Sequence, residues 1–254
     1  MIASPRGDVY SCWMARKATK KTTKTKTAKR PRLGRWLFRW WLRVVSVVFL
    51  LMVAVVLLYS VVNPPTTIYM FQESRRLGGL DRQWVPLKNI APVMARSVVA
   101  AEDANFCNHW GFDLVAIRTA IEEGSGRGAS TISQQVVKNV FLWHGRNWSR
   151  KALEAVMTPL IEALWSKRRI VEIYLNVAEF DEGVFGVEAA ARHYFGVGPE
   201  ELTAVQAARL AAILPLPKER SASNPSKSVR RRAAAILDGA ATIDADGRAT
   251  CFQS

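Results

Sequence analysis

The feature that most constrains this chain is an uninterrupted apolar run from Val44 to Val62, which contains no charged side chain. At a rise of about 1.5 Å per residue, a helix of this length just spans a hydrocarbon core about 30 Å thick. A buried core helix is the alternative, but the run has no polar face. Aromatic residues also stand where interfacial aromatics belong, at Trp36, Trp40, Trp41 and Tyr59. We therefore predict one transmembrane helix over residues 44–62.

The flanks of this run predict its topology. A cleaved signal peptide fits poorly, because the preceding leader of 43 residues is long and basic, and no small-residue cleavage site precedes Asn63. Five arginines lie just before the run, whereas the next basic residues after it are Arg75 and Arg76. The positive-inside rule therefore places residues 1–43 in the cytoplasm and everything after Asn63 outside it.

The formal net charge of +15 belongs mainly to the leader. Residues 1–43 hold 13 Lys/Arg and one acid, which leaves 23 Lys/Arg against 20 acids in the rest of the chain. Anionic lipid headgroups are the simplest partner for such a tail, so no nucleic-acid partner is predicted. The three cysteines and three histidines show no zinc-site spacing. We expect the cysteines to be unpaired, although a Cys107–Cys251 bridge could form in an oxidising compartment.

The rest of the chain is predicted to be mainly α-helical. An extended connector over 63–91 leads to a helical domain over 92–243, followed by a C-terminal tail, 244–254. Pro92 suits a first helical position, Ser149 can cap a long helix through Arg169, and two more helices are expected near 203–214 and 228–241.

Glu102 and Asp103 are the first candidates for chemistry. An apolar helix rich in Ala and Val ends on these two acids, where negative charge conflicts with the helix dipole. The acids could simply terminate the helix. A carboxylate among apolar residues can instead have a raised pKa, as a general base working near neutral pH requires. On these residues alone, the two interpretations are balanced.

Three further polar clusters follow. A glycine-rich loop over 124–128 leads into a helix that starts at Ser130 or Thr131, where Ser130, Gln134 and Lys138 would share one face and suit sugar hydroxyls and phosphate. A solvated face is the simpler alternative. Arg146, Arg150 and Lys151 form a basic group near Glu154 and several aromatic residues, which suggests a surface that binds phosphate at a membrane interface. An ordinary core patch with solvated arginines is the alternative. The fourth cluster, 167–176, is by itself an unremarkable helix.

Together, the order and spacing of these clusters resemble the glycosyltransferase family 51 domain, most closely its monofunctional biosynthetic peptidoglycan transglycosylases. The family's motif ED-x-x-F-x-x-H-x-G-x-D is complete from Glu102 to Asp113, and G-x-STI-x-QQ-x-x-KN from Gly128 to Asn139. RK-x-x-E follows at 150–154 and K-x-x-I-x-E-x-YLN at 167–176. The resemblance extends over about 85–243, with no departure at a motif position.

The resemblance implies a lysozyme-like helical domain with a small membrane-associated lobe. It also implies polymerisation of lipid II into β-1,4-linked glycan with inversion and release of undecaprenyl pyrophosphate, outside the bacterial inner membrane. Glu102 would be the general base, and Glu154 would assist at the leaving group, where a divalent cation (Mg²⁺ or Mn²⁺) could take part; no organic cofactor is implied. The substrate-binding residues expected by motif match are Asp103, Phe106, His109, Ser130, Thr131, Gln134, Gln135, Lys138, Asn139, Arg146, Arg150, Lys151, Glu172 and Asn176.

Three other functions compete with this one. A lytic enzyme would share the fold and the glutamate, but its substrate carries no pyrophosphate and would not need the basic cluster. A transpeptidase is not expected, because no Ser-x-x-Lys occurs. A membrane scaffold would have no reason to keep Glu102, Lys138 and Glu154 together. Expected partners are lipid II, the lipid-linked glycan, membrane lipids and proteins of cell-wall synthesis or division.

Overall fold

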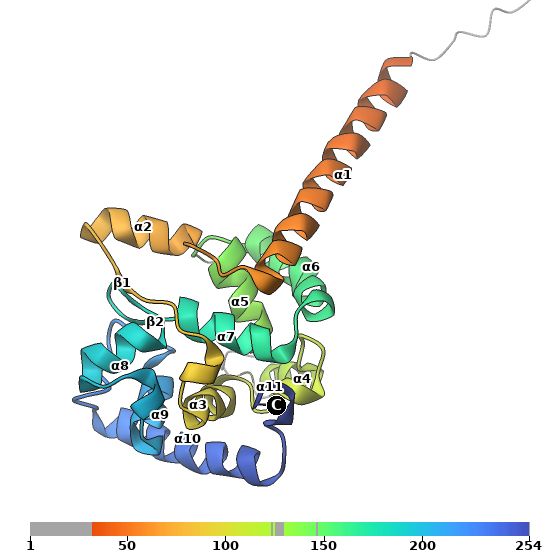
Figure 1. Ribbon diagram of the computed structural model, residues 1–254. Coiled ribbons are helices and arrows are strands. Elements are labelled where there is room, and N and C mark those ends of the chain that lie inside the picture. The colour runs from red at the N-terminus through yellow and green to blue at the C-terminus, as the bar shows by residue number, and fades with distance from the viewer. Residues whose placement is uncertain (1–31, 123, 125–129, 146, 254) are drawn as a thin grey trace, which may run out of the picture. The chain divides into compact units, whose positions relative to one another are not determined.

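The computed structural model describes residues 32–122, 124, 130–145 and 147–253 (Figure 1). By their contacts, residues 1–47 and 48–254 form two separate units, and the division lies within the first helix, α1 (Arg32–Val61). Among the described residues, α1 is the one helix long and apolar enough to cross a membrane, over Gly34–Val61. The predicted apolar run therefore lies almost entirely in one continuous helix, and the apolar side chains between Trp36 and Leu51 are exposed.

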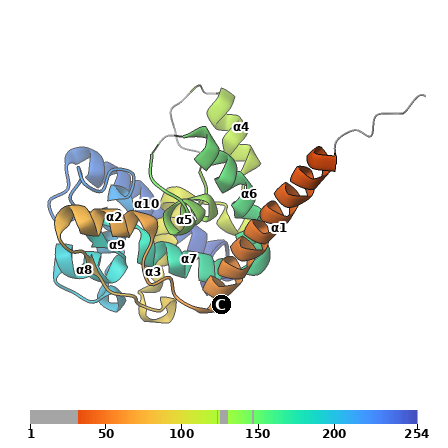
Figure 2. The ribbon, with the colours of Figure 1, turned by 90° about the horizontal axis from the view of Figure 1, so that it is seen from above.

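The second unit is mainly helical, as predicted (Figure 2). Its elements are α2 (Ile68–Leu77), β1 (Asp81–Arg82), η1 (Leu87–Asn89), α3 (Pro92–Glu102), η2 (Phe106–Asn108), α4 (Leu114–Glu122), α5 (Ile132–Phe141), α6 (Trp148–Leu164), α7 (Lys167–Val177), β2 (Glu179–Asp181), β3 (Val184–Phe185), α8 (Val187–Phe195), η3 (Pro199–Glu201), α9 (Ala204–Ile213), α10 (Lys227–Ala245) and α11 (Thr250–Gln253). In the described part of the chain, the strands form one small sheet in the order β1-β3-β2, parallel between β1 and β3 and antiparallel between β3 and β2.

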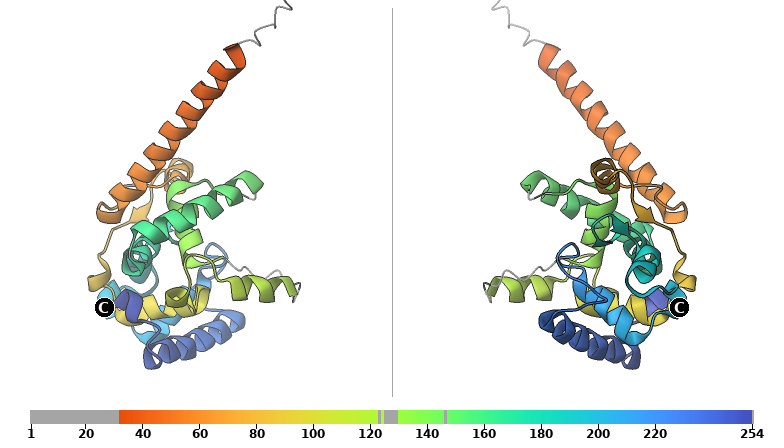
Figure 3. Two further views of the ribbon diagram at one scale, coloured as in Figure 1. Left: turned by 90° about the vertical axis from the view of Figure 1, so that its right-hand side faces the viewer. Right: turned by 90° about the vertical axis from the view of Figure 1, so that its left-hand side faces the viewer.

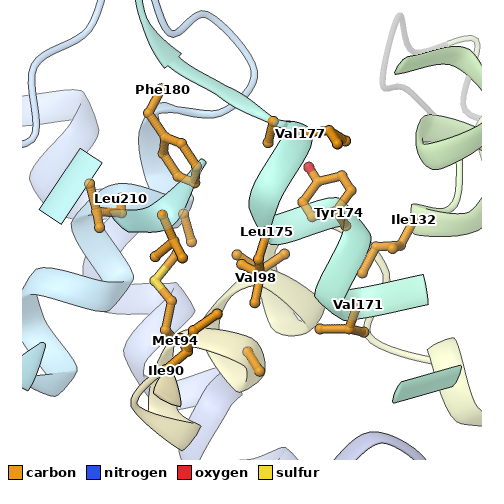
Figure 4. Close-up of a cluster of buried hydrophobic side chains, with 14 of the residues drawn as sticks. Ile90, Met94, Val98, Ile132, Val171, Tyr174, Leu175, Val177, Phe180 and Leu210 are labelled. Carbon is orange, nitrogen blue, oxygen red and sulfur yellow. The ribbon is translucent and has the colours of Figure 1, made fainter. Parts of the chain in front are cut away.

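The core gathers around α3 and α7. Met94 and Val98 of α3 meet Leu175 of α7 and Leu210 of α9, and all four are fully buried (Figure 4). The helices α3, α9 and α10 pack on one another, while α5 packs on α6 and α7. In contrast, α4 has no buried residue and projects from the domain (Figure 3). Packing against neighbouring helices thus fixes α3, which ends at Glu102, and α5.

Several helix boundaries follow local signals in the sequence. Pro92 is the first residue of α3, where its missing N–H costs nothing. The side chains of Thr131 and Thr203 cap α5 and α9, each in a capping box with the glutamine three residues later. These features confirm the predicted helix starts at 92, 131 and 203.

The expected single helix over 149–169 is wrong. The structure has α6 and α7 instead, because the chain leaves the helix at Trp165 and Ser166 caps a new one. Asn147 caps α6 in place of Ser149, and Pro159 lies inside α6 without ending it. The connector is also not extended throughout, since it contains α2, which Thr67 caps.

The expectation of unpaired cysteines is corrected as well. Cys107 of η2 and Cys251 of α11 form a disulfide across 144 residues of sequence. Phe252 is fully buried and packs near Phe106. The last residues of the chain, expected to be a tail after residue 243, are therefore fastened to the segment that follows Glu102. Cys12 lies outside the described residues.

Candidate active site

Glu102 is the last residue of α3, and its carboxylate is held by groups from two other helices. Gln135 of α5 donates from Nε2 to Oε2 at 2.9 Å, and Arg232 of α10 lies 3.4 Å from Oε1. The Glu102 side chain is only 14% exposed. Burial raises its pKa, and the Gln135 hydrogen bond and the charges of Arg232 and Lys138 oppose that shift, while Asp103 adds to it. The result is a carboxylate with a raised pKa, as a general base requires.

The amide of Gln135 is itself oriented. The hydroxyl of Tyr174, on α7, donates to Gln135 Oε1 at 3.2 Å, which leaves the NH₂ group to face Glu102. Tyr174 is fully buried, and its burial raises its pKa, so the hydroxyl keeps its proton. A chain of hydrogen bonds therefore runs from α7 through α5 to the carboxylate at the end of α3.

Two cavities are lined by Glu102, Gln135 and Tyr174. The larger, about 580 Å³, is lined by Glu102, Asp103, Asn105, Asp113, Ser130, Thr131, Arg232 and several apolar residues. The smaller, about 240 Å³, has a lining that includes Gln135, Lys138, Asn139, Tyr174, Tyr69, His144 and Glu179. Glu102 lines the larger cavity and its hydrogen-bond partner Gln135 lines the smaller one, so this pair joins the two spaces. Substrate hydroxyls could reach the carboxylate through the larger cavity.

A basic cluster lies beside Glu102. Lys151 approaches Ser130 Oγ at 3.3 Å and Glu154 at 2.9 Å, and Arg150 pairs with the same glutamate. Burial lowers the pKa of Lys138, and so do the charges of Arg150 and Lys151. Three cations thus lie near one another: Glu154, only 3% exposed, is the counter-charge of Arg150 and Lys151, and the charge of Glu102 acts on Lys138. Such a group favours an incoming polyanion, because the anion relieves their mutual repulsion. Arg146 lies outside the described residues.

The divalent cation allowed by the resemblance does not fit this cluster. Glu154 already has Arg150 and Lys151 as partners. Among the described residues, no three His, Cys, Asp or Glu side chains gather around a common point. Hard divalent cations need several oxygen ligands, and a single neutralised carboxylate does not supply them. The proposed reaction therefore has no step that uses a metal.

Several residues expected to bind substrate instead have partners within the protein. Asp103 accepts from the backbone N–H of Ile132 and pairs with His109 at 2.7 Å, and Phe106 is fully buried. Thr131 and Gln134 form the capping box of α5. The side chains of Glu172 and Asn176 bind the backbone of residues 85–87. These seven residues hold together the helices that carry the site, although Asp103 and Thr131 also line the larger cavity.

Two residues at the site were not singled out by sequence. Tyr174 lies within the fourth motif, but the sequence of that segment predicts only an unremarkable helix end. Arg232 stands in a run of three arginines, and no local signal distinguishes it from Arg230 and Arg231. Only the packing of α10 against α3 brings it to Glu102.

The chain is similar to known proteins over most of its length. A family model described as "Transglycosylase" matches residues 70–241. A biosynthetic peptidoglycan transglycosylase of Jannaschia sp. (strain CCS1) is 59% identical over 239 residues, 94% of this chain and 99% of the relative. Proteins of the same name from Pseudomonas fluorescens (strain SBW25) and Caulobacter vibrioides (strain ATCC 19089 / CIP 103742 / CB 15) are 50% and 44% identical over 84% and 86% of this chain, and 93% and 99% of their own lengths. The chain therefore belongs to the transglycosylase family.

Proposed function

We propose that this protein is a peptidoglycan glycosyltransferase that polymerises lipid II into β-1,4-linked glycan, with Glu102 as its general base. The observation that carries the proposal is the juxtaposition of one largely enclosed carboxylate with a cluster of cations beside it. A glycosyl transfer from a lipid pyrophosphate needs both: a base for the incoming hydroxyl and positive charge for the leaving group.

Glu102 acts on the acceptor. Its carboxylate takes the proton of the acceptor's 4-hydroxyl as the oxygen attacks the anomeric carbon of the donor from the face opposite the pyrophosphate. Gln135 and Arg232 hold the carboxylate in place and keep it ionised before the attack. The bond from the anomeric carbon to the pyrophosphate oxygen breaks as the new glycosidic bond forms, so the configuration inverts.

The basic cluster acts on the donor. Lys138, Arg150 and Lys151 neutralise the negative charge that develops on the departing pyrophosphate. Glu154 orients Arg150 and Lys151 by pairing with both. A lytic enzyme would not need this positive charge, because its substrate releases no pyrophosphate.

The substrate's lipid also accounts for the anchor. The apolar helix α1 holds the enzyme at a membrane, with residues 1–43 in the cytoplasm and the catalytic domain on the outer face of the bacterial inner membrane. Exposed apolar side chains on α2 and α6, including Phe71, Val156 and the 90% exposed Trp148, supply a surface that lipid can cover. Binding to proteins of cell-wall synthesis or division stays a prediction.

The test is a product analysis. Purified full-length protein is incubated with lipid II, and the products are separated by size. We expect glycan polymers that a muramidase digests, with release of undecaprenyl pyrophosphate. Soluble sugars released from finished cell wall, without polymer from lipid II, would support the lytic alternative.

A further inference from the structure

The C-terminal end of the membrane helix is fastened to the catalytic domain rather than tethered to it. Val56 is fully buried, and the indole N–H of Trp165 donates to its carbonyl at 2.8 Å. Tyr59 lies against Phe141, the last residue of α5, with ring centroids 5.9 Å apart. The last turns of α1 thus rest on the end of α5 and on the junction between α6 and α7.

Arg169 completes this attachment. Its guanidinium donates to the carbonyls of Tyr59 and Val62, at 2.8–3.1 Å, and to the Asn63 side chain at 2.9 Å. It also pairs with Glu172 within α7. All five of its N–H groups are used in this way. The final carbonyls of a helix have no donors of their own, and a cation there suits the helix dipole, so Arg169 caps α1 from another helix.

The two helices that receive the anchor, α5 and α7, also carry the Gln135–Tyr174 pair that contacts Glu102. Arg169 lies one and a half turns before Tyr174 on α7, and Tyr174 orients Gln135. Phe141 ends α5, which carries Gln135 and Lys138 toward Glu102. A rigid path of short helices therefore joins the end of the membrane span to the carboxylate and the basic cluster.

We propose that Arg169 is a positioning residue that fixes the height of the active site above the membrane. This inference rests on the proposed function, because only a substrate held by a lipid tail keeps its reacting atoms at a set distance from the bilayer. A domain on a loose tether would sample many heights, and small misplacements of reacting groups reduce rates strongly. The capped end of α1 removes that freedom.

The experiment compares two formats of the same reaction. Full-length wild type and Arg169→Ala are assayed in phospholipid vesicles with lipid II of natural chain length, and in detergent with a short-chain, water-soluble analogue. In vesicles we expect kcat/KM of Arg169→Ala to fall by about tenfold or more, because the reacting groups are misplaced. With the soluble analogue we expect both proteins to agree within about twofold, since no membrane sets the height.

Two further variants sharpen the result. Arg192→Ala removes another arginine paired with a glutamate on its own helix and should match wild type in both formats. Arg169→Lys keeps the charge but has fewer donors, so it should lie between wild type and Arg169→Ala in vesicles. If Arg169→Ala does not fold, Arg169→Lys and Asn63→Ala decide the question by the same comparison.

An equal loss in both formats would show that Arg169 only supports the fold, and no loss in vesicles would show that the attachment does not matter; either overturns the inference. Failure of the proposed function looks different, because the wild type would then make no polymer in either format.

Discussion

Nε2 of Gln135 lies 2.9 Å from Oε2 of Glu102, and this hydrogen bond joins the end of α3 to the middle of α5. Tyr174 sets the orientation of the Gln135 amide by donating a hydrogen bond to its Oε1. The bond favours the ionised carboxylate against the burial that disfavours it. Neutral groups as well as charges therefore act on the carboxylate of the proposed base, and each can be tested separately.

Replacing Tyr174 by Phe removes the hydroxyl that orients Gln135. We expect the pKa of Glu102 to rise further, because the amide loses its fixed orientation. A base must be deprotonated to act, so activity is lost as pH falls through this pKa, and the acid limb of the profile should move to higher pH. The pH dependence of kcat/KM measures the shift. Tyr194→Phe, which removes a hydroxyl bound to Phe180 and Asp181, is the control and should leave the limb in place.

Arg232→Met removes the nearest cation to Glu102 while keeping the apolar part of the side chain. The charge of Arg232 lowers the pKa of Glu102, so its loss should again move the acid limb to higher pH. Activity well above the limb should change less than activity below it. The exposed neighbour Arg231→Met serves as the control. An unshifted limb in Arg232→Met would show that its charge does not act on the base.

Lys138→Met removes a half-buried cation from the basic cluster. We expect kcat to fall by about a hundredfold, the usual cost of losing one group that stabilises developing charge. Steady-state kinetics with lipid II measures the loss. Lys88→Met, at an exposed position of η1, should have no such effect. Similar rates for wild type and Lys138→Met would contradict the proposal that this cluster stabilises the charge of the leaving pyrophosphate.

The Cys107–Cys251 disulfide should stabilise the fold, because it closes a long loop of the unfolded chain. Replacing both cysteines by Ser should lower the free energy of unfolding by about 2–5 kcal/mol. Denaturant unfolding measures the difference, and a reductant should destabilise the wild type but not the double variant. Equal midpoints in all these conditions would show that the bridge adds nothing.

Local signals in the sequence predicted much of the fold. The apolar run, Pro92 and the two threonine caps mark their elements because each depends on residues close in sequence. The break between α6 and α7 was missed, since no Gly or Pro marks it and Ser166 is a small signal within a helical pattern. The disulfide depends on α11 returning to η2, which nothing near either cysteine indicates.

The residues of the site also differ in whether the sequence predicts them. Glu102, Lys138 and Lys151 could be picked out because charge stands among apolar neighbours at motif spacing. The structural partners of Asp103 and Asn176 could not, because their hydrogen bonds depend on how the helices pack. The position of Arg232 depends likewise on the pairing of α10 with α3.

The most direct measurement is the polymerisation rate of Glu102→Gln. This variant keeps the size of the side chain and removes its capacity to accept a proton. With an unfolding midpoint close to that of wild type, it should polymerise lipid II at least about 10²-fold more slowly, as expected for loss of a general base. A folded Glu102→Gln that polymerises at the wild-type rate would contradict the central claim that this carboxylate is the base.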